Sequence, residues 1–144
     1  MERAVGRVGY VLKEVQQALR AAMDDALRRQ ALTTPQYAAL SALAEGGDLS
    51  GAELARRGFV TPQTMNGIVG NLEAAGLIAR RVDPADARVL RVALTPAGRA
   101  RLDACHRAVA VVEERMVSGL RPEERTWLLD ALRRCATALT GARA

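Results

Sequence analysis

The sequence has few aromatic residues, a single lysine and no long apolar run. Phe, Tyr and Trp make up 3% of the 144 residues, whereas the hydrophobic class as a whole reaches 49%. The core must therefore be built mostly from Leu, Val and Ala, which favour packed helices over a β-sandwich. No stretch approaches the roughly 18 apolar residues of a membrane span, and the first residues lack the apolar segment of a signal peptide. We expect a mainly helical, cytoplasmic protein that does not enter a membrane.

Cysteine and histidine are also scarce, and this limits the chemistry open to the chain. Cys105 and Cys135 lack the spacing of a CxxC or metal motif, and His106 is the only histidine. A zinc site or a Ser-His-Asp type of triad therefore has too few members. Both cysteines fall on apolar stripes, which favours small core residues; a thiol redox sensor is the alternative. We expect no metal, no cofactor and no catalytic site.

Arginine supplies almost all the basic charge. The formal net charge is +5, and Lys13 is the only lysine. Residues 50–101 contain eight arginines against four acidic residues, a net charge of +4. Such a distribution is expected of an anion-binding element held by a nearly neutral scaffold.

Apolar spacing and capping residues predict a series of helices. Residues 3–30 carry a heptad seam, from Val5 to Ala26, which suits pairing with another helix. Helix starts are predicted at Thr34-Pro35, Ser50, Thr61-Pro62, Thr95-Pro96 and Pro122. The last helix is expected to bury Trp127, Leu128, Ala131, Leu132, Cys135 and Leu139.

Residues 77–94 read LIARRVDPADARVLRVAL and predict a charged β-hairpin. Residues 89–94 alternate in the period of a half-buried strand, and Asp83-Pro84 supplies the turn. A charged hairpin can be a solvated edge that resists aggregation, or a finger that reaches an anion.

Two capped helices joined across Gly58 and followed by this hairpin form a helix-turn-helix with a wing. In such a unit the N-terminal residues of the second helix contact base edges in the major groove. Asn and Gln side chains can bond adenine bidentately, and hydroxyls suit phosphates. On the exposed face of the same helix, Gly67 and Gly70 fit either close approach to another surface or tolerated drift. The residues placed to read DNA are Thr61, Gln63, Thr64 and Asn66.

The segment from Glu53 to Arg99 resembles the winged helix-turn-helix of MarR-type transcriptional regulators. It contains their Leu-Glu-x-x-Gly-Leu-Ile junction, Asp-x-Arg wing and Leu-Thr-x-x-Gly exit, and the flanking helices fit the family's order. The resemblance implies a homodimer in which the first helix and the last two intertwine, and a double-stranded, pseudo-palindromic DNA operator. It also implies that the wing-tip arginine, Arg88, enters the minor groove, oriented by Asp86 or Asp83.

The resemblance predicts one MarR-like domain over residues 1–144. Its winged helix-turn-helix lobe would span residues 33–98, and a helical dimerisation region would span residues 1–32 and 99–144. The full set of expected DNA-binding residues is Thr61, Gln63, Thr64, Asn66, Arg80, Arg81, Asp86, Arg88 and Arg56. For Arg56, Arg80 and Arg81, phosphate contact and a solvated surface charge both stay open.

The expected function is that of a repressor released by a small-molecule effector. Family members bind phenolic ligands in a cleft beside the DNA-binding lobe, for which Tyr10, Tyr37 and His106 are the candidates; ordinary packing accounts for them equally well. Two alternatives remain: a redox-sensing regulator that uses Cys105 and Cys135, and a winged-helix protein-interaction module that does not read DNA.

Overall fold

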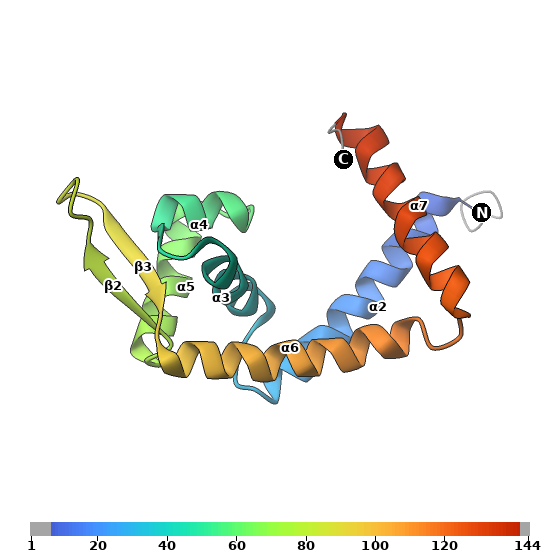
Figure 1. Cartoon of the computed structure of the whole chain (residues 1–144), viewed down its shortest axis with the longest axis horizontal. Helices are drawn as coiled ribbons and strands as arrows, with labels where there is room; N and C mark the ends of the chain where they lie inside the picture. Colours follow the sequence, from blue (N-terminus) through green and yellow to red (C-terminus); the bar gives the residue numbers. More distant parts are fainter. Residues whose placement is uncertain (1–6, 142–144) are drawn as a thin grey trace.

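The computed structural model describes residues 7–141, which form helices around a small antiparallel sheet (Figure 1). In chain order the elements are α2 (Val8–Arg28), α3 (Thr34–Gly46), β1 (Leu49–Ser50), α4 (Gly51–Arg57), α5 (Pro62–Ala74), β2 (Ile78–Val82), β3 (Leu90–Leu94), α6 (Pro96–Met116) and α7 (Pro122–Thr140). The predicted fold, mainly helical with a β-hairpin wing, is confirmed. Over residues 7–141, no helix is long and apolar enough to cross a membrane.

Side-chain caps fix where the helices of the DNA-binding unit begin. The predicted caps Ser50, Thr61 and Thr95 each accept a hydrogen bond from the backbone N–H three residues later. The predicted cap Thr34 is wrong by one residue, because Thr33 forms a reciprocal capping box with Gln36. The hydroxyl of Thr34 instead donates to Asp24 on α2, at 2.5 Å.

The sheet has the order β1-β3-β2, and every pairing in it is antiparallel. β2 and β3 form the wing, in a register that sets Ile78 opposite Leu94 and Val82 opposite Leu90. Val92 in the middle of β3 is buried, whereas Leu90 near the tip is 45% exposed because the wing extends past the core. The two-residue strand β1 was not predicted, since two residues are too short to show an alternating pattern.

One hydrophobic core joins α3, α4, α5 and the sheet to the first half of α6. Its fully buried side chains include Leu40, Leu54, Leu72 and Leu102. The apolar spacing of α6 predicts a stripe of Leu102, Cys105, Val109, Val112 and Met116; the first four are buried, whereas Met116 is 48% exposed. The expected core position of Cys105 is therefore confirmed, and burial raises the pKa of its thiol.

The expected burial of α7 is wrong for the single chain. α7 has no buried residue; Trp127 is 65% exposed, Leu139 is 90% exposed, and Cys135 is exposed as well. The reason is geometric: α7 turns away after the loop that follows α6 and has no extensive contact with another element of the described chain (Figure 1). The α2 seam is similarly uncovered at Leu12 and Val15, while Val5 of that seam lies outside the described residues.

Candidate nucleic-acid interface

Helix α5 is anchored by one face and presents the other to solvent. Met65, Val69 and Leu72 are buried in the core, whereas Gln63 and Asn66 lie on the exposed side. The two amide side chains are consequently free to form hydrogen bonds with a partner.

The first turn of α5 is fixed by two of the predicted DNA-binding threonines. Thr61 Oγ1 accepts the backbone N–H of Thr64 at 3.1 Å and lies 3.0 Å from the Thr64 hydroxyl. Both residues are exposed. Their hydroxyls lie at the N-terminus of α5, where the backbone dipole favours an anion.

A groove connects this helix to the wing. It has a volume of about 430 Å³ and is lined by residues of α4, α5, β2 and β3, including Gln63, Asn66 and Arg80. Three predicted DNA-binding residues that are up to 17 positions apart in sequence therefore border one concave surface.

The wing tip presents Arg88, whose side chain is 90% exposed. Asp86 holds this arginine: its carboxylate accepts bonds from Arg88 Nε at 3.2 Å, from Nη2 at 3.3 Å and from the backbone N–H at 3.0 Å. These bonds lower the pKa of the Asp86 carboxyl, with the side-chain bond from Arg88 as the largest cause. Of the two carboxylates considered from sequence, Asp86 is therefore the one that orients Arg88.

Asp83 has a different role, in closing the turn. Its Oδ1 accepts the backbone N–H of Ala85 at 2.7 Å, and its own N–H donates to the Val89 carbonyl at 2.9 Å. Its second carboxylate oxygen lies 3.9 Å from Arg91 Nε.

Arginines on the body of the wing brace it against the lobe. Arg80 makes a two-pronged pair with Glu73 of α5, at 3.1 and 3.2 Å. This pairing is the main cause of a lowered pKa of the Glu73 carboxyl. Arg81 pairs with the Asp48 carboxylate. Both arginines are thus already bound to carboxylates in the free chain.

Arg91, the fourth arginine of the hairpin, is a bracing residue that was not among the predicted DNA-binding residues. It lies opposite Arg81 in the strand register, an arrangement of like charges that alone would be unfavourable. Its guanidinium donates to the Asp48 carbonyl at 2.9 Å and lies 3.5 Å from Glu53 Oε1. The only signal was the presence of carboxylates near the hairpin arginines, which does not reveal the pairing. The spacing of Ser50 and Glu53 predicts a capping box, of which only one half forms: Ser50 Oγ accepts the Glu53 N–H at 3.1 Å, while the Glu53 carboxylate lies near Arg91.

Arg56 lies exposed in the last turn of α4. Its guanidinium forms no ion pair with any residue in the range 7–141. In contrast to Arg80 and Arg81, it is available to an external anion without breaking a contact within the chain.

Comparison with known proteins identifies the family. Residues 32–89 match the MarR family model. The HTH-type transcriptional repressor Rv2887 of Mycobacterium tuberculosis is 37% identical over 119 residues, which cover 82% of this chain and 86% of that protein. The chain belongs to the MarR family. The HTH-type transcriptional repressor NicR of Pseudomonas putida is 34% identical over 128 residues, covering 89% of this chain and 81% of NicR.

Solved structures of MarR-family proteins superpose on nearly the whole chain. Rv2887 in complex with p-aminosalicylic acid has a TM-score of 0.76 and 32% identity, covering 91% of this chain and 99% of that one. BpsR of Bordetella bronchiseptica, whose DNA binding is regulated by 6-hydroxynicotinic acid, has a TM-score of 0.77 and 29% identity, covering 90% and 98%. The predicted MarR-type, DNA-binding transcriptional regulator is confirmed.

The candidate effector residues do not form a single group in this MarR-family chain. Tyr37 Oη lies 2.7 Å from His106 Nδ1, and the two rings meet edge to face at 5.4 Å. Burial raises the pKa of the Tyr37 hydroxyl. Tyr10 lies in the first turn of α2, 17 residues before Leu27 at the lobe end of that helix. At about 1.5 Å per residue this distance is about 25 Å, so Tyr10 does not join the pair within one chain.

Proposed function

We propose that this MarR-family chain is a homodimeric repressor that binds a pseudo-palindromic DNA operator and is released by a small aromatic acid. The observation that carries the DNA part is the groove of about 430 Å³ in which the exposed amides of α5 meet the wing. The exposed face of α5 on one side of this groove and the wing on the other correspond to the major-groove and minor-groove parts of a winged helix-turn-helix footprint.

Each DNA contact is proposed from what the side chain can reach. Gln63 and Asn66 would bond adenine edges, and the hydroxyls of Thr61 and Thr64 would bond the phosphate beside them. Arg88, held by Asp86, would enter a narrow minor groove. α5 has no lysine or arginine, so phosphate charge would be met by Arg56, with Arg80 and Arg81 dividing their bonds between phosphate and carboxylate.

DNA binding and dimerisation would belong to different parts of the chain. Residues 33–98 would bind DNA, and residues 1–32 and 99–144 would dimerise. Each repressor protomer would then place one α5 in a half-site, and the half-sites would lie about 34 Å apart.

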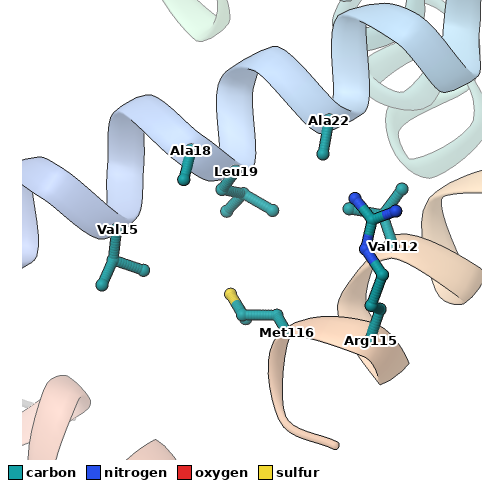
Figure 2. A pocket seen from close by; sticks show the side chains of 7 residues that line it. All are labelled: Val15, Ala18, Leu19, Ala22, Val112, Arg115 and Met116. Atoms are coloured by element: carbon teal, nitrogen blue, oxygen red, sulfur yellow. The ribbon is translucent and has the colours of Figure 1, made fainter.

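Uncovered apolar surface supports the homodimer. A hollow of about 270 Å³ lies between α2 and α6. Figure 2 shows the side chains that line it: Val15, Ala18, Leu19, Ala22, Val112, Arg115 and Met116. Val15 and Met116 are more than 40% exposed in the single chain. Trp127 and Leu139 on α7 are also exposed, and contiguous exposed apolar surface of this kind marks protein–protein interfaces. A second copy, related by a two-fold axis, would cover it.

Aromatic acids are the proposed effectors because of what two relatives bind. Rv2887 has been crystallised with salicylic acid and with p-aminosalicylic acid, and 6-hydroxynicotinic acid regulates BpsR. In this chain the Tyr37–His106 pair joins α3 to α6, and the one O–H or N–H that the bond between them leaves over can donate to a carboxylate. Bound there, an acid would favour a lobe spacing that no longer fits successive major grooves. This population shift requires tighter ligand binding to the released state.

A regulator of this kind needs no enzymatic activity, and we place it in the cytoplasm, where its DNA lies. A redox mechanism through Cys105 is disfavoured by its complete burial and raised thiol pKa. The pure protein-interaction alternative is disfavoured by the exposed Arg88 tip.

Fluorescence anisotropy with upstream DNA and a scrambled duplex, across a salt series, tests the proposal. Wild type is expected to bind the upstream DNA selectively with a steep salt slope, and Arg88→Ala to bind at least about tenfold more weakly. Arg28→Ala is the matched control, since Arg28 is also exposed and paired with a nearby aspartate, Asp25, at 3.1 Å. Equal loss in both variants, or none in Arg88→Ala, would refute the wing-tip role. Binding without DNA selectivity would refute operator recognition.

A further inference from the structure

Phe59 lies in the turn between α4 and α5, and no residue of the range 7–141 covers it. It is the only phenylalanine of the sequence and is 96% exposed, more than any other large hydrophobic residue in the described part of the chain. Its φ is +53°, in the left-handed region that bulky side chains rarely adopt. The ring therefore contributes almost no burial to the fold, in a backbone conformation that disfavours it.

The left-handed conformation is imposed by the way α4 ends. The N–H of Phe59 and that of the next residue bond to carbonyls three and five residues back, which is the Schellman motif. α2 and α5 end with the same pair of bonds, and the corresponding positions are Ala31, at φ +57°, and Gly76, at φ +75°. The motif usually takes glycine at this position, so a phenylalanine there needs a separate explanation.

The neighbouring Gly58 does not relieve the turn. It has an ordinary φ of −86°, and a Cβ on it would lie 3.3 Å from Met65 Cε and 3.4 Å from the Leu54 carbonyl oxygen. Close packing therefore accounts for Gly58, and the left-handed residue remains Phe59.

The surroundings of Phe59 indicate what the ring contacts. Thr61, the cap of the recognition helix α5, follows Phe59 by two residues. Arg56, whose guanidinium has no ion-pair partner within residues 7–141, lies in the last turn of α4, just before Phe59. The ring is thus continuous with the proposed DNA surface and next to an exposed positive charge. In protein–DNA interfaces apolar side chains, phenylalanine among them, contact the thymine methyl group, while arginines bond the adjacent phosphates.

We propose that Phe59 is a further DNA-contacting residue of this regulator. Its ring would pack against the edge of the major groove, on a thymine methyl group or a deoxyribose, with Arg56 on the neighbouring phosphate. The contact rests on the proposed DNA-binding function and adds to it an uncharged contribution to affinity outside the recognition helix.

The test compares Phe59→Gly and Phe59→Asn with Ala31→Gly, the same backbone relief at the end of α2. Glycine and asparagine both tolerate a positive φ, so the Phe59 variants should melt at or above the wild-type temperature. They are expected to bind the selected operator about tenfold more weakly with an unchanged salt slope, since no charge is lost. Ala31→Gly should bind as wild type, and Arg56→Ala should reduce the salt slope by about one.

The wild-type measurement distinguishes failure of the Phe59 contact from failure of the proposed function. If wild type binds the operator and both Phe59 variants bind equally tightly, the Phe59 contact is refuted while the proposed function stands. If wild type binds no DNA selectively, the proposed function fails and the contact with it. Where the Phe59 variants do bind more weakly, replacing thymine by uracil in the operator distinguishes the two contacts: a loss of affinity in wild type that the Phe59 variants do not share supports the methyl group, and equal losses, or none, support deoxyribose.

Discussion

Replacing Gly98 by alanine should loosen the junction between the wing and α6. Gly98 is buried in the first turn of α6. An added Cβ would overlap the carbonyl oxygen of Leu77 and lie 2.9 Å from its carbonyl carbon. Carbon atoms pack best at about 3.5–4.0 Å, so this backbone must separate from α6 by roughly 1 Å. Because the obstacle is main chain, no side-chain rotation relieves it.

The magnitude follows from what that separation breaks. Thr95 N–H donates to the Leu77 carbonyl at 3.1 Å, and the Thr95 hydroxyl donates to the Gly76 carbonyl at 2.6 Å. Weakening both bonds costs about 1 kcal/mol each, and overpacking adds about 1–3 kcal/mol. The better helix propensity of alanine returns up to about 1 kcal/mol. We expect a net loss of about 2–5 kcal/mol in the free energy of unfolding, which lowers Tm by roughly 5–15 °C.

Thermal and urea melts of Gly98→Ala beside Gly67→Ala and Gly70→Ala test this estimate. A Cβ at Gly67 or Gly70 meets no atom within 4 Å, so each control should be about 0.5–1 kcal/mol more stable than wild type. A Gly98→Ala protein as stable as wild type would refute the reasoning. If the stable controls also bind the operator more weakly, the exposed glycines serve close approach to DNA; unchanged affinity would favour tolerated drift.

Three further outcomes are expected. Cys105 should resist a thiol reagent in the native protein and react only on unfolding, because its thiol is buried and its pKa raised; rapid native modification of Cys105, resolved by mass spectrometry, would reopen the redox alternative. The folded-state pKa of Asp86 is lowered, so its stabilising effect is present above the unfolded pKa of about 3.9 and is lost as pH falls through the folded value. Urea melts between pH 5 and pH 3 should accordingly show a smaller loss of stability in Asp86→Asn than in wild type, and equal losses would contradict this. The emission of Trp127, the only tryptophan, should shift to longer wavelength on dilution if a second copy covers it; a red-shifted, concentration-independent spectrum would count against the homodimer.

Local sequence signals predicted those parts of the fold that local interactions determine. The caps at Ser50, Thr61 and Thr95 were predictable because each hydroxyl bonds an N–H only three residues away. The error at Thr34 arose because two adjacent threonines offer the same signal, and only the reach of Gln36 back to Thr33 decides between them.

Long-range pairings were beyond such signals. The brace from Arg91 to Asp48 crosses 43 residues of sequence, and no period or spacing indicates it. The apolar stripe of α7 was predicted correctly, but such a stripe does not reveal whether the residues that pack against it belong to the same chain. Trp127 and Leu139 are exposed, so no residue of the described chain buries them.

Helix α6 is the element through which a change of lobe position must pass. At its first turn it is locked to the base of the wing by Gly98 against Leu77, and further along Arg101 donates to the Gln30 carbonyl at 2.8 Å. His106 then contacts Tyr37 on α3. Since Leu77 and Tyr37 belong to the lobe, a change in the position of the lobe relative to α6 would disrupt both of their contacts with α6. An effector of the proposed kind would therefore act by reorienting each α6, with its lobe attached, against the partner protomer.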